Sequence, residues 1–185
     1  MSTATLPSQT VTSHWGTAIV VDHIDVTGIL HYVLPAGLGT GSIPVEEIPI
    51  DQVIADAEPL RVEFLASMNA IAEAHDEPPV LDLDLTVQLW QAGYDDPMIS
   101  HPARIVAWCF LACSEAPPNT ESGALAFPDP RNASSQTAMP GLPWGRQLMV
   151  RPVPGAHVAA PGWTTWAVVP LARGQYSLVA FATAR

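Results

Sequence analysis

Two aspartates, Asp82 and Asp84, have residue types and a spacing that could do chemistry. They lie in a segment where apolar and polar residues alternate, so a β-strand there would place both carboxylates on one face, roughly 6.5 Å apart. Carboxylates at that spacing could hold a divalent cation or act as an acid and a base. Because a two-residue pattern is unspecific, we favour the simpler interpretation. It is a solvated face, or an aspartate that faces an arginine on the next strand.

Tryptophan supplies a second group of candidates, because this chain contains six. Alternation places Trp90 on the polar face of its strand, and it places Trp163 and Trp166 on opposite faces of another strand. Exposed aromatic side chains are typical anchors of interfaces and ligand pockets. The alternative is packing beneath a long loop. The predicted binding residues, for a ligand or a partner, are Trp90, Trp163, Trp166, Asp82 and Asp84.

The other reactive residue types form no recognisable catalytic motif. The six histidines lack the spacing of a metal motif. Cys109 and Cys113 would lie about 13 Å apart in a strand, too far for a disulfide, so we expect buried apolar thiols. There is no Gly-x-Ser-x-Gly elbow and no phosphate loop. The sequence therefore predicts no catalytic residue, no metal and no cofactor, and it leaves open whether the chain is an enzyme.

Composition excludes some partners. A net charge of −11 argues against binding to nucleic acid and to anionic membrane surfaces. No apolar run reaches the ~20 residues that span a bilayer, and the first residues do not have the pattern of a secretory signal. We therefore expect a cytoplasmic protein. All seven basic residues are arginine, which is typical of codon usage in a GC-rich genome.

One strand and one helical region organise the rest of the chain. In residues 80–91 the apolar side chains of Leu81, Leu83, Leu85, Val87 and Leu89 share one face, which predicts a half-buried strand. Residues 51–75 are amphipathic, and Pro59 can begin a second helix there. We expect this helical region to pack on the leucine face of the strand.

The remaining segments predict further strands and loops. A hairpin is expected at 17–26 and 28–34, a strand covered on both faces at 104–113, a strand at 146–153, and a closing hairpin at 162–171 and 175–183. Residues 35–49 and 93–102 are expected to form a loop and a turn. Residues 114–145 are rich in proline and serine, so a long loop is expected that is functional, mobile, or hides a short helix near 132–138.

The closing segment, residues 149–183, resembles a known family. It contains Val-Arg-Pro-Val-Pro-Gly-Ala, then Trp-Thr-Thr-Trp-Ala-Val-Val-Pro-Leu, then Tyr-Ser-Leu-Val-Ala-Phe-Ala-Thr. These motifs are similar to the last strands of small uncharacterised actinobacterial Mog1/PsbP-like proteins. The resemblance implies an α/β/α sandwich and a role in protein binding.

We therefore predict a flexible tail at 1–13 and a single α+β domain at 14–185. Its fold would be a mostly antiparallel twisted sheet of about seven strands, with residues 51–75 on one face. The alternative is a small β-barrel with a helix. The predicted function is a non-catalytic, self-associating protein-interaction module. The alternative is a barrel that binds an apolar small molecule, such as a biosynthetic cyclase acting by shape.

Overall fold

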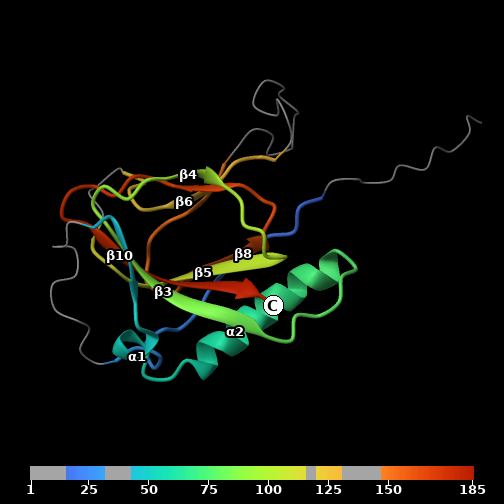
Figure 1. The fold of residues 1–185 in the computed structure, drawn as a ribbon. Coiled ribbons are helices and arrows are strands. Elements are labelled where there is room, and N and C mark those ends of the chain that lie inside the picture. The colour runs from blue at the N-terminus through green and yellow to red at the C-terminus, as the bar shows by residue number, and fades with distance from the viewer. Residues whose placement is uncertain (1–15, 32–42, 116–119, 131–146) are drawn as a thin grey trace, which may run out of the picture.

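The computed structural model describes residues 16–31, 43–115, 120–130 and 147–185. Its strands form two antiparallel sheets that face each other, and a helix covers the outer face of the larger sheet (Figure 1). The six-stranded sheet runs in the order β1 (Val20–His23), β8 (Ala156–Pro161), β5 (Ile105–Cys113), β10 (Tyr176–Ala184), β3 (Leu83–Gln91) and β2 (Val45–Ile48). The four-stranded sheet runs β4 (Asp96–Ile99), β9 (Trp166–Val168), β6 (Leu125–Phe127) and β7 (Leu148–Val150).

The chain passes repeatedly between these sheets. Strands β3, β5, β8 and β10 belong to the larger sheet, whereas β4, β6, β7 and β9 belong to the smaller one. These eight strands, β3 to β10, are antiparallel within two facing sheets, which makes a jelly-roll-like fold. The antiparallel pairing was predicted correctly, but the single sheet of about seven strands and the small closed barrel were both wrong.

The helical region agrees with its prediction. It consists of α1 (Ile50–Val53) and α2 (Glu58–Ala74), and a proline stands in the first turn of α2. The buried face of α2 includes Leu60, Phe64 and Met68, which pack with Leu83 and Val87 of β3 in the core between helix and sheet. Periodicity of apolar residues in both elements therefore predicted their contact.

Aromatic side chains fill the space between the two sheets. The rings of Trp108 and Trp166 meet edge to face with centroids 4.8 Å apart, and Phe127 and Phe181 also pack on Trp108. Trp90 belongs to the same cluster. Strand β5 is consequently covered on both faces, as expected. The second face of β3 was predicted to be polar, and it is covered only at Trp90, since Asp84 on that face is exposed.

Both predicted hairpins are wrong. Strand β1 pairs with β8, and the described part of the segment after it forms a bridge between Leu30 and Ile54. The closing segments do contain a glycine turn, with Gly174 at a φ of 81°. They enter different sheets, however: β9 pairs with β4 and β6, whereas β10 pairs with β3 and β5. Turn chemistry predicts a reversal of the chain, but it does not tell which sheet the next strand joins.

Some expected loops contain strands. Strand β6 lies inside the predicted loop 114–145, β2 lies inside 35–49, and β4 lies inside 93–102. The short helix expected near 132–138 and the tail at 1–13 lie outside the described residues. In the parts of the chain that the structure describes, no helix is long and apolar enough to cross a membrane.

Candidate functional site

A cleft of about 600 Å³ opens where three segments meet. These segments are the end of α2 with the loop after it, the connection from β4 to β5, and the turn that follows β8. Polar and aromatic side chains line this cleft, namely His75, Glu77, Ser100, His101, Arg104 and Trp163. The size is within the range of small-molecule sites, which are concave and carry a few convergent polar groups.

The backbone of Gly162 connects two walls of the cleft through hydrogen bonds. Its N–H donates to the carbonyl of Arg104 at 2.9 Å, and its own carbonyl accepts from the N–H of His101 at 2.8 Å. A Cβ at this position would lie 1.8 Å from the carbonyl oxygen of Ala103. Only glycine permits such a close approach. The contact fixes Trp163, the next residue, relative to His101 and Arg104.

Two imidazoles line the cleft. Nδ1 of His101 accepts the N–H of Ala103 at 3.0 Å, and its ring meets Phe181 edge to face. The proton of the neutral His101 ring therefore belongs on Nε2, which is then a donor. Nε2 of His75 is buried and has no hydrogen-bond partner within the described residues. Because buried polar atoms are normally hydrogen-bonded, an unpaired nitrogen on a residue that lines the cleft is a candidate functional group.

Arg104 brings a positive charge to the same cleft. Its Nη1 donates to the carbonyl of Pro78 at 2.7 Å and lies 3.5 Å from Oε2 of Glu77. No contact involves Nη2 or Nε in the residues that the structure covers. The guanidinium is therefore anchored at one nitrogen and keeps an edge for another acceptor.

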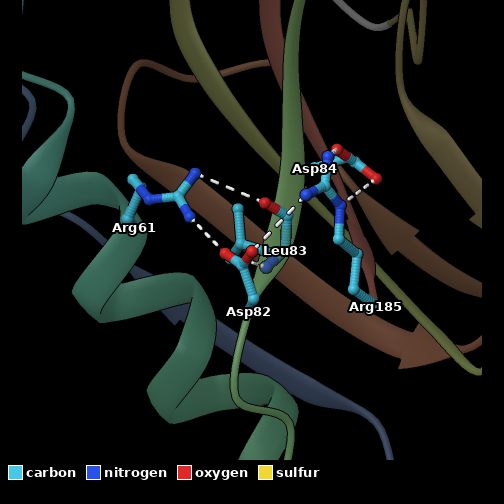
Figure 2. A network of polar contacts seen from close by, with 5 residues as sticks. All are labelled: Arg61, Asp82, Leu83, Asp84 and Arg185. Atoms are coloured by element: carbon cyan, nitrogen blue, oxygen red, sulfur yellow. Dashed lines mark hydrogen bonds and ion pairs between the residues drawn. The ribbon is translucent and has the colours of Figure 1, made fainter.

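The aspartate pair lies in an arginine network (Figure 2), and none of the residues of this network lines the cleft. Nη2 of Arg61 approaches Oδ1 of Asp82 at 2.6 Å, and Arg185 binds both oxygens of Asp84. The hydrogen bond from Arg185 holds the pKa of Asp84 below its ordinary value. This is the simpler interpretation of the pair, an aspartate facing an arginine next to the neighbouring strand. Carboxylates already held by guanidinium groups are poorly disposed to bind a cation.

Of the three predicted tryptophans, two lie in the core and one lines the cleft. Trp90 and Trp166 are buried between the sheets, and Nε1 of Trp90 donates to Gln88 at 2.9 Å. Trp163 is 56% exposed and lines the cleft. Of the five predicted site residues, only Trp163 therefore meets the cleft. The prediction missed His75, His101 and Arg104, since they come from separate segments and have no motif spacing.

Cys109 is a buried thiol, as expected, whereas Cys113 is half-buried. Both are free, and burial raises the pKa of Cys109 and of Cys113 to about 12. A thiol needs its thiolate form to act as a nucleophile. These two groups are therefore part of the packing and supply no reactive sulfur near neutral pH.

Comparison with known proteins gives similarity at the level of structure. No protein-family model matches the sequence, and no curated protein matches it either. A prolyl-4-hydroxylase from Pseudomonas putida aligns with a TM-score of 0.48 and 19% identity, over 71% of this chain and 68% of that one. An oxidoreductase of the 2OG-Fe(II) oxygenase family from Burkholderia pseudomallei aligns with a TM-score of 0.40 and 10% identity, over 89% and 67%.

These findings correct two predictions. The Mog1/PsbP-like assignment is wrong, because it implied an α/β/α sandwich, whereas the strands form two facing sheets. The predicted non-catalytic, self-associating interaction module is contradicted in that both similar structures bear the names of enzymes, a prolyl-4-hydroxylase and an oxidoreductase. Its alternative, a barrel with a ligand inside, also falls, since aromatic side chains pack between the sheets.

The described residues do not fit an iron centre. A non-haem iron site of the oxygenase kind requires two histidines and one carboxylate around open positions. Within the described ranges, no three side chains of histidine, cysteine, aspartate or glutamate come together in a way that could hold a metal ion.

Proposed function

We propose that the cleft beside α2 is the active site of an enzyme that transfers protons with its own imidazoles. Its size and its convergent polar groups support this proposal. Histidine is the side chain best suited to give and take protons near neutral pH. Two histidines, a carboxylate and a guanidinium line this one cavity.

The unpaired Nε2 of His75 carries the proposal. A buried nitrogen without a partner gains a hydrogen bond when a substrate group enters, so it is placed to act as a base. In the proposed step, a C–H bond next to a substrate carbonyl breaks and its proton moves to Nε2 of His75. The electron pair stays on the substrate as an enolate.

His101 has the complementary role. Since its Nδ1 accepts a backbone N–H, its Nε2–H can donate a hydrogen bond to the enolate oxygen. Return of a proton from the imidazolium of His75 to the carbon completes the exchange, so no oxidant or reductant is required.

Deuterium exchange tests this proposal without knowledge of the natural substrate. The protein is incubated in D2O with pyruvate, phenylpyruvate, cyclohexanone and phenylacetone, and loss of the C–H signals is followed by proton NMR. We expect protein-dependent exchange with at least one compound, and a rate at least about a hundredfold lower in His75→Gln. The matched control is His31→Gln, because His31 is exposed and its Nε2 contacts only the Asp51 carbonyl.

The pH dependence of the exchange adds a second criterion. A base must be unprotonated, so the exchange rate should rise with pH. Exchange that is absent for all four compounds, or that persists in His75→Gln, would show that the cleft does not act in this way.

A further inference from the structure

The guanidinium of Arg104 determines which substrate this cleft suits. Nη1 is held by the Pro78 carbonyl at 2.7 Å, whereas Nη2 and Nε make no contact with the described residues. Two parallel N–H groups on one edge of a guanidinium match the two oxygens of a carboxylate. Resting on the proposed function, we infer that the substrate carries one carboxylate, which Arg104 binds.

The nearby Glu77 does not prevent this binding. Its Oε2 lies 3.5 Å from Nη1 of Arg104, which is longer than the roughly 2.7–2.9 Å of a charge-assisted hydrogen bond. Its side chain is 43% exposed, so the pair is loose and solvated. A substrate carboxylate at Nη2 and Nε leaves this contact in place, because it uses a different edge of the same group.

Trp163 indicates what the carboxylate is attached to. The ring is 56% exposed on the wall of the cleft, and the apolar side chains of Ile71 and Pro161 line the cavity with it. A large exposed aromatic ring beside a charged anchor is suited to an apolar or aromatic substrate body. The inferred class is therefore an aryl- or alkyl-carboxylate.

The net charge of the chain limits how many negative charges the inferred ligand can carry. The chain has a net charge of −11, which repels anions over long range. Each additional negative charge on a ligand increases that repulsion, while the cleft offers one arginine in return. Monocarboxylates are thus favoured over polyphosphates and over compounds with several carboxylates.

Benzoate and benzamide separate the charge of a ligand from its shape. The two compounds have the same ring and nearly the same size, but only benzoate is an anion. The 1H–15N correlation spectrum of the full chain is titrated with each, and shifts are followed at the backbone amides of residues 71–77 and 100–105. We expect benzoate to shift these amides and to bind about tenfold more tightly than benzamide.

Three variants define the contacts. Arg104→Gln should remove the preference for benzoate, while benzamide still binds. Trp163→Ala should lower the affinity for both compounds. Arg173→Gln, which removes an exposed charge from a turn outside the cleft, should leave the preference unchanged.

The outcomes distinguish this inference from the proposed function. Equal binding of benzoate and benzamide, or a preference that survives in Arg104→Gln, would overturn the inferred carboxylate contact. Failure of both compounds to shift the cleft amides at millimolar concentration would also overturn it. The role of the imidazoles is decided separately by the deuterium exchange of cyclohexanone and phenylacetone, which carry no carboxylate for Arg104 to bind.

Discussion

Arg185, which follows β10, binds both carboxylate oxygens of Asp84 on the neighbouring strand β3. Nε of Arg185 donates to Oδ2 of Asp84 at 2.7 Å, and Nη2 contacts Oδ1 (Figure 2). Both side chains are half exposed, so solvent screens the attraction. We expect Asp84→Asn to lower the free energy of unfolding at pH 7 only slightly, with a smaller loss in 1 M salt. Urea denaturation at both salt concentrations measures this.

The same ion pair predicts a direction with pH. Because the pKa of Asp84 is lowered from 3.8 in the folded chain, its stabilising effect is complete above that value and is lost as the pH falls through the folded pKa. The difference between the parent chain and Asp84→Asn should therefore shrink only below about pH 4. Glu47→Gln, on exposed β2, is the control and should show no such trend. A difference that grows on acidification would contradict this account.

Leu81 and Leu83 test the limits of the strand that organises the fold. Alternation placed both on one buried face, yet Leu83 is 2% exposed and Leu81, which precedes β3, is 84% exposed. Leu83→Ala should cost about 2–5 kcal/mol, because it leaves a cavity beneath α2. Leu81→Ala should change stability by less than about 0.5 kcal/mol. Equal effects in chemical denaturation would show that the strand begins earlier than the structure places it.

Local patterns predicted the elements whose signal lies within a single segment. The apolar pattern of each segment was sufficient to predict α2, β3 and β5, because the apolar side chains of each segment pack in the core. The pattern of β3 failed at Trp90, which was assigned to a polar face. That side chain packs in the second core. The sheet that covers it is built from β4, β6, β7 and β9, which are too short to show a clear period.

The cleft could not be predicted for a similar reason. His75 ends α2, His101 precedes β5, and Trp163 lies in the turn after β8. They meet because β5 and β8 are neighbours in the larger sheet, which brings the connection before β5 beside the turn after β8. Such a pairing between distant segments leaves no spacing in the sequence. The aspartate pair, in contrast, has a spacing that is visible in the sequence, but its carboxylates form ion pairs with arginines.

His157 predicts a further pH effect, on the contact between α2 and the sheet. Its Nδ1 donates to the carbonyl of Trp108 and its Nε2 accepts from the hydroxyl of Ser67, both at 2.8 Å. Burial lowers the pKa of His157 from 6.5, because it penalises the imidazolium. The unfolded chain then binds more protons below about pH 6.5, so stability should fall as the pH drops from there through the folded pKa.

Denaturation of the parent chain and of His157→Gln at pH 8, 6 and 5 measures this effect. The variant should be less stable at pH 8, where it loses the imidazole contacts, and its stability should depend less on pH between 8 and 5. His23→Gln is the control, because His23 is exposed. An identical slope in the parent and in His157→Gln would show that other groups cause the acid sensitivity.

Gly162 links the stability of the fold to the geometry of the cleft. In Gly162→Ala the new Cβ would meet the carbonyl oxygen of Ala103 at 1.8 Å, so the turn must move away from the connection before β5. We expect a loss of about 1–3 kcal/mol in unfolding free energy, together with weaker benzoate binding, because Trp163 and His101 separate. Gly28→Ala is the matched control, since a Cβ there would meet nothing within 4 Å. Denaturation and the benzoate titration are measured on both variants. Benzoate affinity that stays at the parent level in a destabilised Gly162→Ala would show that the turn after β8 does not position the cleft.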